Sequence, residues 1–280
     1  MRQPYLKAKV ALGLVLLMLG LSSVSAIDVD PRDYIAAPPG TDLSIVYAGH
    51  LSSKHGSDLE ADLGIYRYVK YIDWLGMTVD PQFLIPVGDV ELDSADLRAK
   101  GFADPIFAAT FWVINDAKTR TYLGITPFLI PPWGHYQRGN PLSLGQNRWR
   151  VIPQVGFVQG LSDKTFVELV GDVTFYGDNT DFNRAGERLA QAPSLQVQLL
   201  VSHSWRENVY FGANLSYEDI GENTLAGVDL NDPIERTKLS IYAVNWLTKQ
   251  HQLQVKYSRD LHADKAIETH QLQLRWTYVF

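Results

Sequence analysis

The sequence contains no cysteine. A disulfide framework, a thiolate metal site and a thiol nucleophile are therefore excluded. Long hydrophobic runs are also missing after residue 26, where the longest mainly apolar stretch is Ile106 to Ile114. Because a membrane helix needs about 20 apolar residues, this part of the chain cannot cross a bilayer as a helix.

The first 26 residues have the pattern of a secretory signal peptide. Arg2, Lys7 and Lys9 precede an apolar core from Val10 to Leu21, and Val24-Ser25-Ala26 forms a small-residue cleavage site. A membrane anchor is the alternative, but about 12 apolar residues are too few to span a bilayer. We therefore expect export and cleavage after Ala26.

Basic residues are fewer than acids. The signal removes three of the 25 basic residues and none of the 31 acids, so the mature chain has a formal charge of −9. Nucleic acid is not an expected partner, because phosphate binding requires a basic surface.

Alternation of apolar and polar residues with period two recurs in segments of about ten residues after residue 40. In the last segment, Leu272, Leu274 and Trp276 share one face, and Gln271 and Gln273 share the other. A soluble β-sandwich would also alternate. The signal peptide, the aromatic residues near strand ends and the spacing of the connections favour an outer-membrane barrel.

The alternation predicts an all-β, antiparallel up-and-down barrel of about twelve strands in the outer membrane of a Gram-negative bacterium. The predicted strands are 41–51, 61–73, 76–87, 102–114, 119–131, 148–160, 164–177, 193–206, 208–219, 234–247, 250–260 and 268–280. Short and long connections alternate, which places short turns and both termini in the periplasm. The expected division is a signal peptide (1–26), a periplasmic N-terminal segment (27–40) and the barrel (41–280). Closure pairs every strand edge, which stabilises the protein without disulfides.

Two features resist this strand map. In 61–73 the alternation does not decide which face is turned to lipid. Prolines also fall within or at the ends of predicted strands, and proline cannot donate to a ladder, so we expect bulges there. These prolines are Pro81, Pro86, Pro105, Pro127, Pro131 and Pro153.

The polar face of the strands predicts a channel lining. Its residues are Arg148, Arg150, Gln154, Glu168, Asp172, Gln196, Gln198, Asn214, Lys238, Gln252, Gln254, Lys256, Gln271, Gln273 and Arg275. A water-filled pore lined in this way would pass small polar solutes and favour anions. The alternative is a plugged interior in which these charges pair with one another.

No residue pattern indicates catalysis or a metal site. His203 adjoins Ser204, but neighbours in a strand point to opposite faces and cannot share a proton. Acids in the long loops, such as Asp89 and Asp229, form no recognisable calcium loop. Five of the seven tryptophans are expected in interfacial belts; they are Trp112, Trp149, Trp205, Trp246 and Trp276.

A set of motifs, in order along the chain, resembles one family. They are Arg32-Asp33-Tyr34, Pro38-Pro39-Gly40-Thr41, Val79-Asp80-Pro81-Gln82-Phe83-Leu84-Ile85-Pro86, Gly101-Phe102-Ala103-Asp104-Pro105, Trp112-Val113-Ile114-Asn115-Asp116, Thr119-Arg120-Thr121-Tyr122-Leu123-Gly124, Leu144-Gly145-Gln146-Asn147-Arg148-Trp149 and Gly171-Asp172-Val173-Thr174-Phe175-Tyr176-Gly177-Asp178-Asn179. Together they resemble the outer-membrane transporters named after the meta-cleavage pathway of phenol degradation. The resemblance implies a transport barrel linked to aromatic breakdown, and it carries no catalytic residues. Gly221-Glu222-Asn223 departs from a glycine-richer loop of the family.

We expect a monomeric, porin-like channel for passive uptake of small organic solutes, aromatic compounds among them, with no cofactor and no enzymatic activity. Expected partners are outer-membrane lipid, lipopolysaccharide and the barrel-assembly machinery, which would recognise the strand ending at Phe280. A lipid-modifying hydrolase and a structural or adhesive barrel without a solute path are the alternatives.

Overall fold

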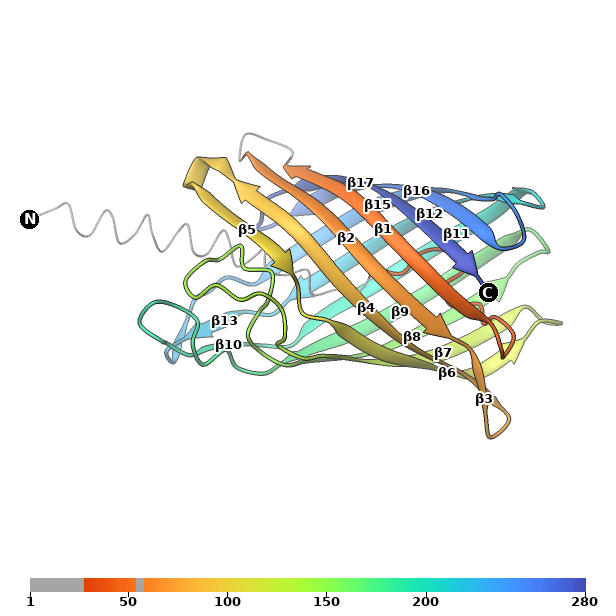
Figure 1. Cartoon of the computed structure of the whole chain (residues 1–280), viewed down its shortest axis with the longest axis horizontal. Coiled ribbons are helices and arrows are strands. Elements are labelled where there is room, and N and C mark those ends of the chain that lie inside the picture. The colour runs from red at the N-terminus through yellow and green to blue at the C-terminus, as the bar shows by residue number, and fades with distance from the viewer. Residues whose placement is uncertain (1–27, 54–57) are drawn as a thin grey trace, which may run out of the picture.

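The computed structural model describes residues 28–53 and 58–280. The expected signal peptide and its cleavage site lie outside these residues. Twelve antiparallel strands form the wall of a closed barrel (Figure 1). They are β1 (Asp42–Ser53), β2 (Leu59–Lys70), β4 (Met77–Leu92), β6 (Ile106–Asp116), β7 (Thr121–Ile130), β8 (Arg150–Gly160), β9 (Thr165–Tyr176), β11 (Ser194–Arg206), β12 (Val209–Ile220), β15 (Ile234–Trp246), β16 (His251–Ala263) and β17 (Thr269–Val279). The predicted fold class is confirmed.

The first and last strands close the barrel. β1 pairs with β17 from Leu43 opposite Val279 to Ser53 opposite Thr269, and β2 pairs with both β1 and β4. Each wall strand therefore pairs with a strand on both sides, and the wall has no free edge exposed to lipid. Among the described residues, no helix has the length and apolar character to cross a bilayer.

The two ends of the barrel differ. The turn end has short connections and both ends of the wall, at Asp42 and Val279. A small hairpin projects from it, formed by β3 (Ile72–Trp74) and the first residues of β4 (Figure 1). The loop end has the long connections, where loops 177–193 and 221–233 form a small sheet of β10 (Leu189–Gln191), β13 (Asn223–Leu225) and β14 (Val228–Asp229).

The loop predicted at residues 88–101 is largely β-structure. β4 continues to Leu92, turns through the 3-10 helix η1 (Asp93–Ala95), and pairs with β5 (Leu97–Phe102). The predicted strand 102–114 is interrupted at Ala103-Asp104-Pro105, where pairing with β4 passes from β5 to β6. Proline at position 105 lacks the N–H that a continuous ladder would use.

The bulges predicted at prolines do not occur. Register shifts lie instead between Trp112 and Ile114, Ser204 and Arg206, and Thr237 and Lys238. Pro127 lies directly opposite Pro153, and both strands keep their register on either side. Because each proline lacks an N–H, pairing is interrupted locally between β7 and β6 and between β8 and β9. No extra residue is inserted, so side chains continue to alternate between the two faces of each strand.

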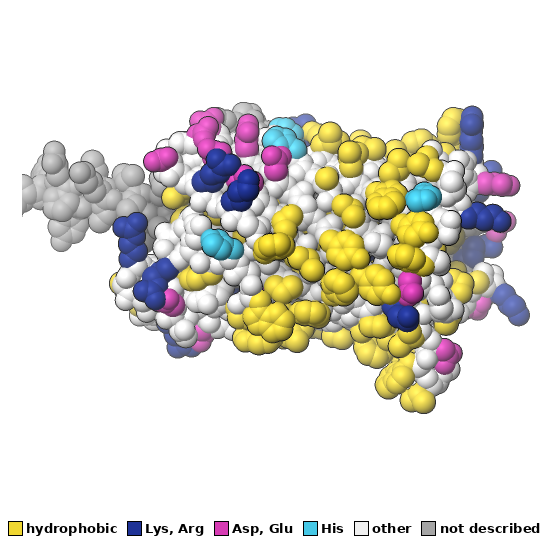
Figure 2. Space-filling view, viewed as in Figure 1, with side chains coloured by type: hydrophobic (Ala, Val, Ile, Leu, Met, Phe, Trp, Pro, Cys, Tyr) yellow, Lys and Arg dark blue, Asp and Glu magenta, His cyan; other side chains and the backbone are white. Residues whose placement is uncertain are grey.

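Apolar side chains cover the outside of the wall. Leu199, Ile241, Leu274 and other large apolar residues are exposed on the alternate positions of their strands. A band of hydrophobic side chains covers the middle of the visible face, and charged side chains gather toward the two ends (Figure 2). In β2, whose faces the sequence left undecided, Leu63, Ile65 and Arg67 share the inner face.

Candidate functional site: the barrel interior

The N-terminal segment (residues 28–40) enters the barrel, where residues 28–37 are buried or half-buried and Pro38, Pro39 and Gly40 remain exposed. The sequence predicted residues 27–40 as a periplasmic lead-in. In the structure, the backbone N–H of Val29 donates to Gln198 Oε1 at 3.1 Å, and that of Arg32 donates to Glu168 Oε1 at 2.7 Å. Wall side chains therefore satisfy backbone groups that have no strand partner, as buried polar groups require.

Acids of the segment pair with cations of the wall. The Asp28 carboxylate lies 2.8 Å from Lys238 Nζ and 3.0 Å from Lys256 Nζ. Arg275 donates to Asp30 at 2.8 Å and to Asp33 at 3.0 Å. Arg67 also reaches Asp33, at 2.9 Å. Four fixed cations therefore hold three carboxylates, so most of the burial penalty of each charge is offset.

Arg32 anchors the segment to the opposite side of the wall. Its guanidinium donates to the hydroxyls of Ser202 and Ser204 at 3.1 and 2.9 Å. It also lies over the Tyr210 ring at 4.1 Å and the Phe166 ring at 4.9 Å. Cation–π contact and hydrogen bonds together stabilise this cation inside the barrel.

Tyr34 fills the space left by two glycines. Its hydroxyl lies 2.9 Å from both Thr126 Oγ1 and Gln154 Oε1. A Cβ at Gly156 would lie 2.4 Å from the Tyr34 ring, and one at Gly124 would lie 3.0 Å away. The ring also packs edge-on against Trp112, which is buried inside the barrel and so does not belong to an interfacial belt. The glycines therefore create a socket for the aromatic ring.

Together with wall residues, the segment closes the turn end of the interior. Val29 and Tyr34 belong to a buried apolar cluster with wall residues. The other buried members are Tyr71, which follows β2, and the wall residues Ile45, Tyr47, Val69, Trp112, Tyr122, Val158, Val170 and Leu200. The segment and this cluster therefore fill the interior at this level.

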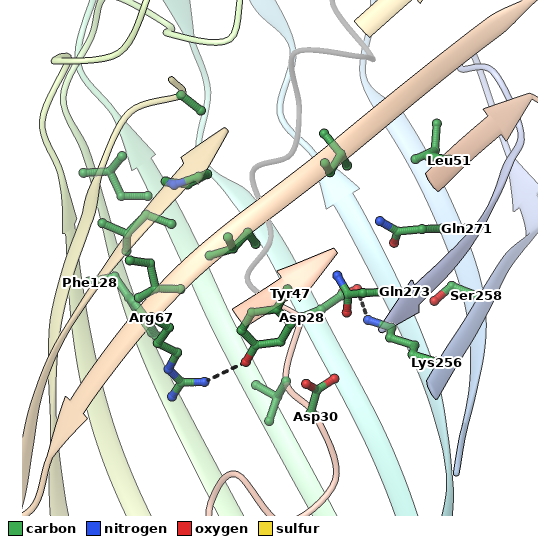
Figure 3. A pocket seen from close by; sticks show the side chains of 18 of the residues that line it. Asp28, Asp30, Tyr47, Leu51, Arg67, Phe128, Lys256, Ser258, Gln271 and Gln273 are labelled. Atoms are coloured by element: carbon green, nitrogen blue, oxygen red, sulfur yellow. Dashed lines mark hydrogen bonds and ion pairs between the residues drawn. The ribbon is translucent and has the colours of Figure 1, made fainter. Parts of the chain in front are cut away.

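A cavity of about 380 Å³ lies beside the segment, within the barrel. Asp28, Asp30 and Asp33 form part of its lining. One wall is polar and includes Lys238, Lys256, Ser258, Gln271 and Gln273. The facing wall is largely apolar and includes Leu63, Ile65, Leu84, Phe128 and Ile130. Lys256, Gln273 and Ser258 lie on one side of Asp28 and Phe128 on the other (Figure 3).

The loop at residues 131–149 narrows the other end of the cavity. Asp104, at the break between β5 and β6, accepts hydrogen bonds from the backbone N–H groups of Gly134 and Gln146, both at 2.9 Å. Leu142 packs against Leu59 and Leu92 and is buried. The Tyr136 hydroxyl lies 2.9 Å from the carbonyl oxygens of Asp181 and Phe182 in the neighbouring loop. The opening at the loop end is therefore built from contacts between loops.

All the predicted lining residues in wall strands point inward, but they occupy different levels. Arg150, Gln154, Lys238, Lys256, Gln271 and Gln273 line the cavity. Glu168, Gln196, Gln198 and Arg275 contact the N-terminal segment. Asp172, Asn214 and Gln252 are buried and hydrogen-bond with Gln154, Gln198 and Arg275. Gln254 is also buried, and Arg148 lies in the loop before β8.

Several interior residues were missed by the sequence reading. Asp28, Asp30, Asp33 and Tyr34 lie in the segment, and Arg67 lies in a strand whose faces were undecided. The density of acids at residues 28–33 is the one local signal for them, and it does not reveal their distant partners. The apolar residues that line the cavity could not be recognised in the sequence. When both faces of a strand carry apolar residues, the alternation does not show which face points inward.

The residues considered for catalysis or metal binding lie on opposite faces of a strand or in ion pairs. His203 is exposed on the outer face and lies 2.9 Å from Thr165 Oγ1, whereas Ser204 faces inward toward Arg32. Asp89 in the loop-end hairpin pairs with Arg98 and Lys100. Within residues 28–53 and 58–280, no three His, Asp or Glu side chains gather as a metal site would require.

Comparison with known proteins identifies the family. The model of the family named for the MetA-pathway of phenol degradation matches residues 41–276. The chain belongs to this family. It is also similar to an outer membrane channel from Pseudomonas putida F1, with 33% identity, a TM-score of 0.85, and coverage of 90% of this chain and 100% of that one. This member of the family is thus an outer-membrane β-barrel, like the solved channel from Pseudomonas putida F1.

More distant structures share the fold alone. The NanC porin aligns with a TM-score of 0.53 at 8% identity, covering 84% of this chain and 98% of that one. The β-domain of the Bordetella autotransporter BrkA aligns with a TM-score of 0.54 at 11% identity, covering 87% and 100%. No protein of curated function matches the chain.

Proposed function

We propose that the protein is a passive channel for small organic solutes whose path is opened when the N-terminal segment leaves the interior. The cavity of about 380 Å³ carries this proposal. Its size lies within the range of about 300–1,000 Å³ that holds small molecules in proteins. It lies inside a closed wall, and a segment outside the strands, not the wall itself, obstructs the turn end.

The mixed lining favours organic solutes over simple ions. A purely polar pore would offer no apolar wall of Leu84, Phe128 and Ile130. The family name supports aromatic compounds as candidate solutes. An organic solute gains by moving its apolar part out of water and against the apolar wall. We place the turn end in the periplasm, with the protein acting as a monomer and without enzymatic activity.

Deletion of the segment tests the proposal. The mature chain, with and without residues 28–37, is reconstituted into planar bilayers and into liposomes, and conductance and uptake of a neutral aromatic solute such as benzamide are measured. We expect a small conductance for the intact chain and one at least severalfold larger after deletion. Heat-modifiable migration on gels verifies that each variant is folded. Absence of solute uptake by both folded proteins would reject a channel.

A further inference from the structure

The Asp28 carboxylate is held by two lysines of adjacent wall strands. Both of its oxygens lie 2.8 Å from Lys238 Nζ, and Oδ2 lies 3.0 Å from Lys256 Nζ (Figure 3 shows the contact with Lys256). The Lys256 side chain is only 4% exposed. This is the geometry of a carboxylate receptor, with two donors converging on one anion.

The two lysines differ in what remains when Asp28 leaves. Lys238 also lies 3.7 Å from Glu218 of the neighbouring strand β12. For Lys256, Asp28 is the carboxylate within ion-pair distance among the residues that the structure describes. Departure of the segment therefore leaves a buried ammonium without its counter-charge, which is strongly unfavourable unless another anion takes the place.

The surroundings restrict which anion would bind well. The cavity that reaches the two lysines is lined on its other side by Leu63, Leu84 and Phe128. A small inorganic anion would leave this apolar wall in contact with water. A neutral apolar molecule would leave Lys256 without a charge partner. A molecule with one carboxylate and a compact apolar body satisfies both walls.

We propose that Lys238 and Lys256 form the binding site for the carboxylate of an organic acid solute, and that Asp28 occupies this site in the closed state as an internal substitute. This rests on the proposed channel function and names its substrate class. The segment and the solute compete for the same two ammonium groups, so binding of the solute favours release of the segment. In this exchange the segment moves and the wall strands stay in place.

Binding of matched ligands tests the competition. Benzoate carries the carboxylate, and benzamide has the same ring without the charge. Their affinities for the purified mature protein in detergent micelles are measured by calorimetry. Asp28→Asn keeps the shape of the side chain and removes the competing charge. We expect it to bind benzoate about tenfold more tightly than the original chain, because more of the protein is then open to the ligand.

Removal of the receptor should have the opposite effect. Lys256→Gln in the Asp28→Asn background should lose at least about tenfold in benzoate affinity, and Lys238→Gln provides a second variant if the first does not fold. Lys249→Gln, in the exposed turn before β16, is the matched control and should leave affinity unchanged. Benzamide lacks the carboxylate, so its affinity should not fall when either lysine is lost.

The outcomes separate this inference from the channel itself. Equal benzoate affinity in the original chain and Asp28→Asn, or unchanged affinity after loss of either lysine, would overturn the site. Uptake of benzamide into liposomes together with such a result would leave the channel standing. Benzoate binding as expected, with no uptake of any solute, would support the site and reject the channel.

Discussion

Asp30 and Arg275 form an ion pair of 2.8 Å inside the barrel, although 245 positions separate them in the sequence. Their side chains are 6% and 5% exposed. Asp30 belongs to the N-terminal segment and Arg275 to the last strand, so the pair joins the plug of the interior to the strand that closes the wall. Losing one member of such a buried pair leaves the other without its counter-charge.

Arg275→Gln is therefore expected to loosen the segment. Loss of one partner of a buried pair costs about 3 kcal/mol. This cost destabilises the state with the segment docked, so the population of the undocked state rises about a hundredfold. Single-channel recording should show more frequent or larger openings. Arg206→Gln, which removes an exposed arginine at the turn end, is the control. If Arg275→Gln conducts like the original chain, Arg275 does not hold the segment.

Gly156→Ala should displace the segment without changing any charge. The new Cβ would lie 2.4 Å from the Tyr34 ring, and the wall strand behind it cannot retreat, so Tyr34 must leave its socket. We expect conductance close to that of the chain lacking residues 28–37. Gly171→Ala is the matched control, since a Cβ there meets only a carbonyl oxygen at 3.8 Å. Similar conductance of the two alanine variants would contradict the socket.

Mild acid should not open the channel. Burial raises the pKa of the Asp28 carboxyl, but Lys238 and Lys256 outweigh it and hold the pKa below its ordinary value of 3.8. Burial likewise opposes Arg275 and Arg67 at Asp33, whose pKa is also lowered. A carboxyl group whose pKa is lowered in the docked state stabilises that state. The stabilisation is complete when the pH is above the ordinary pKa, and it is lost as the pH falls through the lowered pKa.

The resulting measurement is conductance as a function of pH. It should remain constant from about pH 7 to about pH 5 and rise only well below pH 4, where these carboxylates gain protons. Asp28→Asn should remove part of the acid-induced rise. An increase between about pH 7 and pH 5 would indicate that other groups control the segment.

A charge on the outer face should destabilise the barrel in lipid. Leu199 is exposed at the middle of β11, so Leu199→Arg places a cation in the hydrocarbon region at a cost of about 2–4 kcal/mol. Leu261→Arg, near the loop end of β16, should cost about 1 kcal/mol or less. Denaturant unfolding from lipid vesicles measures both. Equal costs would place the two residues at the same depth.

Strand number and the two faces of most strands could be read directly from the sequence. Period-two alternation is a local property, and lipid outside and a polar interior both act on single side chains, so the pattern in β11, β16 and β17 is sufficient. The alternation fails at Leu63, Ile65 and Arg67 of β2, because this inner face is partly apolar and resembles the outer one. The bulges predicted at prolines were wrong because a single strand does not show which residue lies opposite a proline. Pro127 lies opposite Pro153, and this pairing depends on the register of two strands.

The sequence by itself determined a closed, lipid-facing sheet, because each strand carries that information in its own residues. Only the tertiary structure decided that residues 28–40 enter the barrel, since Asp28, Asp30 and Tyr34 are held by Lys256, Arg275 and Gly156 from distant strands. A charge can find its partner, and a ring its socket, only after the wall has closed and brought these residues to one place.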